Sequence, residues 1–266
     1  MLSNLHTHTT FCDGNDTSEA VVLSAIEKGF ASIGFSGHAY TGFDLRYCMK
    51  NTEAYISEIN SLKEKYRGKI QVYLGTEEDA FHPVERSKYD YIIGSSHYFL
   101  KDGVYYPIDS SHEHFKRCLD AFEHNLAQMA ENYYSTFCEY ILKRKPDIIG
   151  HFDLITKYEE VGEPYFYSLK EYNAIAEKYA RVALASGSIF EVNTGAISRG
   201  LRTRPYPSES ILRTILKEGG RITLSSDSHS KDTIDCFFKE SRQMLKDIGF
   251  KTAWFLNNGN FEEMPL

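Results

Sequence analysis

The fold is decided by a stretch near the N-terminus, LSNLHTHTTFCDGNDTSEAVVLSAIEKGFASIGFSGH, residues 2–38. Apolar and β-branched residues at 2–5 and 32–35 predict two buried strands, and the amphipathic segment 17–28 predicts a helix between them. Two strands joined by such a helix pair in parallel through a right-handed crossover. Because His6, His8 and His38 directly follow these strands, we expect all three at one edge of the sheet.

The alternation of strand and helix continues along the chain. Strands are predicted at 70–74, 91–93, 147–149, 189–192 and 221–224, and helices at 52–66, 112–144, 169–185, 208–217 and 233–248. The segment 112–144 is long enough for two helices. About seven such units suit a closed or nearly closed β/α barrel of seven or eight strands, with a doubly wound sheet as the alternative.

Composition excludes several classes of protein. The chain has 266 residues, 42% of them hydrophobic and 25% charged, which is typical of a globular protein rather than a fibrous or disordered one. A net charge of −7 argues against nucleic-acid or anionic-membrane partners. No apolar run is long enough to span a membrane and no basic-apolar leader is present, so we expect a cytoplasmic protein. The five scattered cysteines form no C-x-x-C pair and indicate reduced thiols.

Possible metal ligands follow every predicted strand. Residues two apart on an extended strand face the same side, so His6 with His8, and Asp227 with His229, can converge on one ion. His112 and His114 have the same spacing but open a predicted helix, where they diverge. Nitrogen and oxygen donors without thiolates favour Zn, Mn or Fe, and nine ligands suit two or three ions. The nine candidates are His6, His8, Asp13, His38, Glu77, His97, His151, Asp227 and His229.

The motifs together resemble the polymerase-and-histidinol-phosphatase (PHP) family of metal-dependent phosphoesterases, and most of all its stand-alone histidinol-phosphatases. The similarity runs from one end of the chain to the other. The matching segments are HTHT at 6–9 with DG at 13–14, GFSGHA at 34–39, GTE at 75–77, IGSSH at 93–97, KPDIIGHFD at 145–153, EVNT at 191–194 and SSDSH at 225–229.

This resemblance implies a single domain over residues 1–266, folded as a distorted (β/α)7 barrel of the TIM-like kind with a trinuclear metal site. One ion would be held by His6, His8, Glu77 and Asp227, with Glu77 bridging to a second ion. That second ion would also take His97 and His151, and the third would take Asp13, His38 and His229. One position departs from the family pattern: Gly37 stands where many relatives have Asp, which leaves the occupancy of the third site open.

The resemblance also implies basic residues that bind phosphate on the later loops. Arg199 is the first choice, with Arg202, Arg204 and Lys157 as alternatives, and Tyr40 is a candidate for lining the substrate cavity. Each arginine of this run has the alternative of a solvated surface role. Glu77, Asp227 and His229 would act in catalysis through the ions they hold, and Asp153 is one candidate, beside metal-bound water, for protonating the leaving group.

The implied function is hydrolysis of a phosphate monoester by a metal-bridging hydroxide, with L-histidinol phosphate, an intermediate of histidine biosynthesis, as the first candidate substrate. The enzyme would then be a phosphoric monoester hydrolase that acts on a small molecule. The alternatives are action on another small phosphate ester, a nucleotide or a phosphodiester, and a non-catalytic metal-binding module. Phosphate release from a substrate panel separates them.

Overall fold

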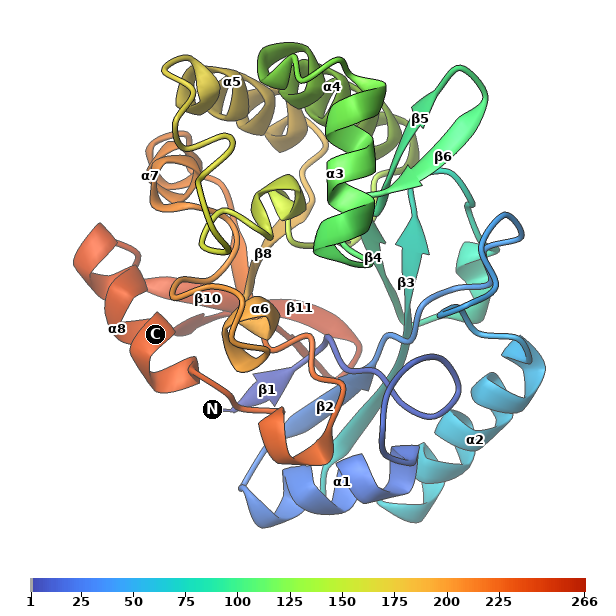
Figure 1. Cartoon of the computed structure of the whole chain (residues 1–266). Helices are drawn as coiled ribbons and strands as arrows, with labels where there is room; N and C mark the ends of the chain where they lie inside the picture. The colour runs from blue at the N-terminus through green and yellow to red at the C-terminus, as the bar shows by residue number, and fades with distance from the viewer. Residues whose placement is uncertain (1) are drawn as a thin grey trace.

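Seven parallel strands form the centre of the protein in the computed structural model, which describes residues 2–266 (Figure 1). Their spatial order follows the chain, without the reversal that marks a doubly wound sheet, and it agrees with the predicted strands. The strands are β1 (Ser3–Asn4), β2 (Ser32–Phe35), β3 (Gln71–Asp79), β4 (Tyr91–Ser95), β7 (Ile148–Ile149), β8 (Ile189–Asn193) and β9 (Ile222–Ser225).

The first and last strands of this sheet meet and nearly close a barrel. The backbone N–H of His8 donates to the Ser228 carbonyl at 2.8 Å, and the N–H of Ser228 donates to the His6 carbonyl at 3.2 Å. Below this pair, the side-chain amide of Asn4 donates to the Ser226 hydroxyl at 2.6 Å. The predicted barrel of seven strands is therefore confirmed, with its seam between the ends of β1 and β9.

Helices alternate with the strands and surround them (Figure 1). Thr17 caps the first helix, and its hydroxyl accepts the N–H of Ala20. The predicted pair of helices within 112–144 is confirmed, because Glu123 and His124 take positive φ angles between α3 and α4. The α-helices are α1 (Ser18–Glu27), α2 (Thr52–Lys65), α3 (His112–Ala121), α4 (Leu126–Arg144), α5 (Tyr172–Leu184), α6 (Gly195–Ser198), α7 (Glu209–Lys217) and α8 (Phe238–Ile248). Short 3-10 turns lie at Arg86–Lys88, Leu154–Thr156 and Lys231–Thr233.

Two antiparallel hairpins were not predicted from the sequence. β5 (Tyr98–Lys101) pairs with β6 (Val104–Pro107), and β10 (Thr252–Asn257) pairs with β11 (Asn260–Pro265). Leu256 of the second hairpin packs into the cluster formed inside the barrel by residues such as Leu5 and Ile148. This C-terminal hairpin thus covers part of the barrel interior. None of the helices in residues 2–266 is both long and apolar enough to cross a bilayer.

A tyrosine fills the interior of the barrel. Tyr91 of β4 is buried and its hydroxyl donates to the Leu5 carbonyl of β1. Its ring needs two glycines, since a Cβ on Gly34 would lie 2.4 Å from the Tyr91 hydroxyl and one on Gly75 would lie 2.3 Å from the ring. The barrel is therefore packed rather than hollow, and the polar groups gather at the carboxyl ends of its strands.

Candidate metal centre

All nine predicted ligands gather at the carboxyl ends of the barrel strands. Backbone pairing sets their positions: Thr7 bridges to Ser228, and His38 bridges to Glu77 beyond the end of β2. Each bridge places candidate ligands from neighbouring strands side by side. The candidates fall into three groups that share His8, His38 or Glu77 with one another.

The first group is formed by His6, His8, Glu77 and Asp227. The Nε2 atoms of His6 and His8 lie 3.4 and 3.6 Å from Glu77 Oε2, and 3.7 and 3.1 Å from Asp227 Oδ1. His6 Nε2, His8 Nε2 and Glu77 Oε2 are buried without a hydrogen-bond partner among the described residues. Buried polar atoms of native proteins normally have a hydrogen-bond partner. Three buried atoms that lack one, and whose lone pairs face one point, therefore fit a divalent cation.

The second group lies on the other oxygen of Glu77. Oε1 is 3.2 Å from His97 Nε2 and 2.9 Å from His151 Nε2. Each carboxylate oxygen of Glu77 therefore faces its own set of imidazoles. This geometry lets one glutamate bridge two ions.

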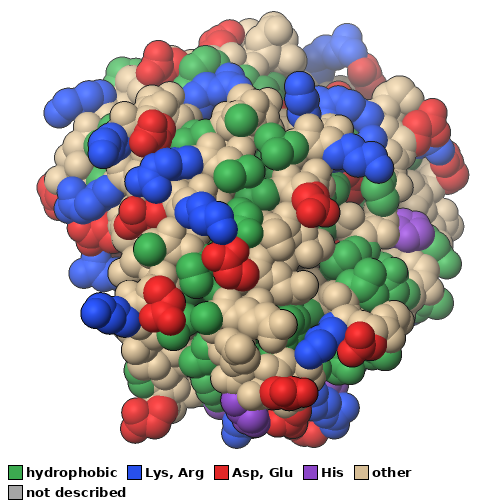
Figure 2. All heavy atoms as spheres, turned by 90° about the horizontal axis from the view of Figure 1, so that it is seen from above, with side chains coloured by type: hydrophobic (Ala, Val, Ile, Leu, Met, Phe, Trp, Pro, Cys, Tyr) green, Lys and Arg blue, Asp and Glu red, His purple; other side chains and the backbone are tan. Residues whose placement is uncertain are grey.

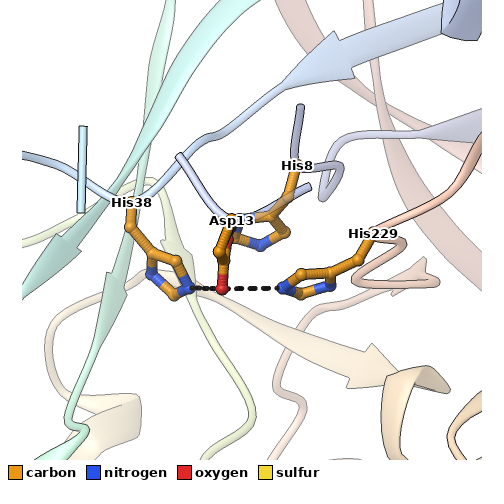
Figure 3. Close-up of side chains that lie close together, drawn as sticks. All are labelled: His8, Asp13, His38 and His229. Atoms are coloured by element: carbon orange, nitrogen blue, oxygen red, sulfur yellow. Dashed lines mark hydrogen bonds and ion pairs between the residues drawn. The ribbon is translucent and has the colours of Figure 1, made fainter. Parts of the chain in front are cut away.

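The third group surrounds Asp13 near the mouth of the site (Figure 3). Asp13 Oδ2 lies 3.6 Å from His38 Nε2 and 3.3 Å from His229 Nε2. The His8 ring stacks on His229 with ring centres 4.2 Å apart. His38 also connects this group to Glu77, because its Nδ1 lies 2.9 Å from Glu77 Oε2.

Two carboxylates that carried no assigned role in the sequence orient these histidines. Glu191 Oε1 lies 2.5 Å from His6 Nδ1, and its other oxygen accepts the backbone N–H of His151 at 2.8 Å. Asp79 Oδ2 lies 3.2 Å from His97 Nδ1. Such carboxylates fix the tautomer of a metal-binding imidazole. Asp79 stands two residues after Glu77 on the same strand face, and this spacing is the signal that could have revealed it.

The electrostatics of the first group are those of a site built for cations. Burial opposes charge on His6, but Glu191, Glu77 and Asp227 outweigh it and raise the pKa of His6 well above its ordinary value. Burial likewise opposes charge on Glu77, yet His38, His6 and His97 hold its pKa well below its usual range. Without metal, these opposite shifts favour a protonated His6 beside an ionised Glu77. For His8, burial and the rings of His229 and His38 instead lower the pKa to about 3.

The groups form the floor of a cavity of about 370 Å³. Arg199 lines it from just after α6, and its Nη1 and Nη2 donate to the backbone carbonyl and Oδ2 of Asp227, both at 3.1 Å. Lys157 also lines the cavity and donates to the Asp109 carbonyl at 2.8 Å. Two of the predicted phosphate-binding side chains thus stand beside the metal groups.

Four of the predicted substrate-binding and catalytic residues do not line this cavity. Arg202 is buried, donates to Thr156 and Tyr167, and stacks over the Tyr206 ring. The side chains of Arg204 and Tyr40 are exposed at the surface.

Asp153, the fourth, is fully buried, and its Oδ2 accepts the backbone N–H of Ser208 at 2.8 Å. The structure therefore separates this candidate proton donor from the cavity wall. The two H-x-H pairs differ in their surroundings. His112 bonds Tyr165, His114 bonds Ser111, and neither belongs to a metal-ligand group among the described residues.

Comparison with known proteins agrees with this geometry. The family model described as "PHP domain" matches residues 4–195, which is most of the chain. The chain belongs to the PHP domain family. The match includes seven of the nine candidate ligands, whereas Asp227 and His229 lie beyond it.

Relatives and a solved structure are similar to this chain over most of its length. A probable histidinol-phosphatase of Schizosaccharomyces pombe is 27% identical, covering 96% of this chain and 89% of its own. The histidinol-phosphatase of Bacillus subtilis is 26% identical, covering 84% of this chain and 92% of its own. A crystal structure of histidinol phosphate phosphatase from Lactococcus lactis, complexed with zinc, L-histidinol and phosphate, aligns with a TM-score of 0.73 and 19% identity over 98% of both chains. The last similarity supports the PHP barrel fold.

Proposed function

We propose that this protein is a metal-dependent phosphatase that hydrolyses L-histidinol phosphate to L-histidinol and phosphate. The observation that carries the proposal is the meeting, in one cavity, of the three ligand groups with Arg199 and Lys157. The cavity of about 370 Å³ has the size of a small-molecule site. The choice of L-histidinol phosphate as the substrate is supported by the names of the relatives and by the L-histidinol and phosphate bound in the Lactococcus lactis structure.

The three groups would hold two or three divalent ions of Zn, Mn or Fe. His6, His8 and Asp227 would hold the first with Glu77 Oε2, and His97 and His151 the second with Glu77 Oε1. The third group, Asp13 with His38 and His229, completes the nine ligands. When bound, such ions activate water as a nucleophile and neutralise charge on the phosphoryl oxygens.

The chain's own groups orient the substrate and stabilise the charge that develops on it. Arg199 donates two of its five N–H groups to Asp227, and its Nη1 also lies 3.3 Å from His229 Nδ1. These contacts fix the guanidinium plane and leave further N–H groups for phosphoryl oxygens. Lys157 adds a positive charge on the cavity wall, balanced by Asp109. Phosphoryl transfer needs positioning and electrostatic stabilisation more than covalent catalysis, and these residues provide both.

The rival activities place different demands on the site. A phosphodiester within a nucleic acid requires an extended basic surface, whereas this chain carries a net charge of −7. A nucleotide or another small phosphate ester fits the same cavity and is the nearest alternative. A non-catalytic metal-binding module does not require an arginine held beside the metal ligands, because metal binding alone involves no anionic substrate.

Phosphate release from a substrate panel tests the proposal. The panel consists of L-histidinol phosphate, a nucleoside monophosphate, a simple alkyl phosphate and a short oligonucleotide, each with protein loaded with Mn or Zn. We expect the highest kcat/KM for L-histidinol phosphate and none above background for His8→Ala. Faster turnover of the nucleoside monophosphate would make a nucleotide, rather than L-histidinol phosphate, the assigned substrate. No turnover of any ester by metal-loaded protein would contradict the enzymatic function.

A further inference from the structure

The loop after β1, residues 9–14, folds back tightly against His8. The carbonyl of Thr9 accepts the backbone N–H groups of Cys12 and Gly14, both at 3.0 Å. Gly14 packs so closely that a Cβ there would lie 2.4 Å from the Thr9 nitrogen and 2.5 Å from the His8 carbonyl carbon. The tight loop therefore leaves Cys12 little freedom to move away from the His8 ring.

The Cys12 sulfur contacts the side of His8 that faces away from the first metal group. Sγ lies 3.5 Å from the Thr9 carbonyl oxygen and 3.6 Å from His8 Nδ1. A thiol carries one proton, and the carbonyl can only accept it, so the S–H donates to Thr9. The sulfur is then left as an acceptor for an N–H on His8 Nδ1.

This arrangement determines which nitrogen of His8 is free to bind metal. With a proton on Nδ1, the neutral ring has its lone pair on Nε2. That atom faces Glu77 Oε2 at 3.6 Å and Asp227 Oδ1 at 3.1 Å, and it is buried without a hydrogen-bond partner among residues 2–266. The thiol therefore stabilises the tautomer that the first group requires.

Cys12 does for His8 what carboxylates do for two other histidines. Glu191 faces the Nδ1 of His6, and Asp79 faces the Nδ1 of His97. Asp13 also approaches His8 Nδ1, at 3.5 Å, but its carboxylate belongs to the third metal group. The neutral thiol of Cys12 can lie beside His8 Nδ1 without adding a negative charge to a site already rich in carboxylates.

Gly37 leaves the space that the sulfur occupies. A Cβ on Gly37 would lie 3.1 Å from Cys12 Sγ and 3.4 Å from the terminal methyl of Met49. The first distance is shorter than an ordinary van der Waals contact, so a larger residue would push the thiol toward His8. Gly37 and Cys12 are thus sterically matched.

We propose that Cys12 is a positioning residue that holds His8 in its metal-binding tautomer and orientation, and that Gly37 provides the room it needs. The inference rests on the proposed function only in that His8 is a metal ligand. It requires neither a particular substrate nor a particular ion.

Metal affinity of the full-length protein, measured by chelator competition with Zn, tests this role without reference to turnover. We expect Cys12→Ala to weaken binding at the tightest site by roughly tenfold, the lower end of the effect of losing an outer hydrogen-bond partner of a ligand. Cys12→Ser keeps one donor and one acceptor and should recover part of the loss. The matched control is Cys138→Ala, which removes a buried thiol of α4 that donates to the Tyr179 carbonyl of α5.

The steric match has its own test in a double-mutant cycle. Gly37→Ala should weaken Zn binding in the wild-type background and have a smaller effect beside Cys12→Ser, because oxygen is smaller than sulfur and bonded closer to the backbone. Additive effects of the two substitutions would contradict the match.

Thermal unfolding of the metal-free variants separates positioning from simple packing. If Cys12→Ala lowers Tm no more than Cys138→Ala but weakens Zn binding more, the positioning role stands. Unchanged Zn affinity in Cys12→Ala, or equal losses in both variants, would overturn it. A failed substrate panel with intact Zn binding would contradict the proposed function and leave this inference untouched.

Discussion

The cavity floor and the arginine run at 199–204 differ in how closely the chain constrains them. On the floor, side chains from six strand ends meet because backbone pairing fixes each position, as in the bridges Thr7 to Ser228 and His38 to Glu77. In the run, three arginines within six residues take three separate surroundings. Arg199 faces the cavity, Arg202 is buried against Tyr206, and Arg204 is exposed.

The difference teaches that spacing has meaning only where the backbone conformation is known. On a strand, two residues apart means the same face. In a loop, a spacing of three residues does not predict where the side chains point unless the conformation of the turn is known. If the comparison is right, substitutions on the floor remove metal and activity together, whereas substitutions in the run have separate effects.

The largest effect is expected on the floor. His8→Ala or Asp227→Ala should reduce kcat/KM for L-histidinol phosphate to background and lower bound metal, because each residue contributes an atom to the first group. Metal content by elemental analysis and phosphate release measure the two effects. His112→Ala is the control, since His112 bonds Tyr165 away from the ligand groups. Loss of metal in His112→Ala equal to that in His8→Ala would break the comparison.

The next effect separates phosphate binding from metal binding. Arg199→Ala should lower kcat/KM by roughly 10²–10³, as expected for a charge-assisted contact that tightens in the transition state. Arg199→Lys should recover only part, since a point charge cannot reproduce the planar fork. Steady-state kinetics and metal analysis check both variants.

The same substitution at Arg204 is the control, because that side chain is exposed and lies near Glu209. A large kinetic loss in Arg204→Ala, with Arg199→Ala unchanged, would move the phosphate contact along the loop. It would leave the metal groups untouched.

A smaller effect follows from the protons that the metal-free floor holds. Burial opposes charge on His38 and His97, but Glu77, with Asp13 or Asp79, outweighs it and raises the pKa of each. A raised pKa means that the proton stays bound until the pH rises through that value, so metal must displace it. Zn affinity should therefore fall as the pH decreases through these raised pKa values, and binding should release protons. Calorimetry in buffers of different ionisation enthalpy measures the release; affinity independent of pH would contradict it.

The smallest kinetic effect is expected from Arg202. Arg202→Met removes donors to Thr156 and Tyr167 but keeps much of the packing on Tyr206, so we expect a loss of stability on the order of 2 kcal/mol. The kcat/KM should stay within about twofold of the wild type, because the side chain does not line the cavity. Chemical denaturation measures the stability, and steady-state kinetics measure kcat/KM. A hundredfold loss of kcat/KM in a stable Arg202→Met variant would make Arg202 a second functional residue of the run, beside Arg199.

Much of the architecture followed from local patterns. The seven parallel strands were predicted because each is a short apolar run and most are followed by a helix, and the break between α3 and α4 because one helix of that length is rare. The two hairpins were missed: their second strands, β6 and β11, are largely exposed and lack a strong apolar signal, and the apolar run at 253–256 of β10 was not assigned to a strand. The role of Glu191 was missed because the histidine that it contacts comes from a distant strand, which only the closed barrel brings beside it. The spacing of Asp79 from Glu77 could have marked it as a candidate, but its contact with His97 is visible only in the structure.

The central claim is that the floor binds divalent ions and that those ions make the protein a phosphatase. The most direct measurement is phosphate release from L-histidinol phosphate by protein stripped with a chelator, before and after Mn or Zn is returned, with bound metal counted in the same samples. The account predicts no turnover in the stripped protein and recovery in step with two or three ions bound per chain. Full turnover by protein shown to be free of metal would contradict it.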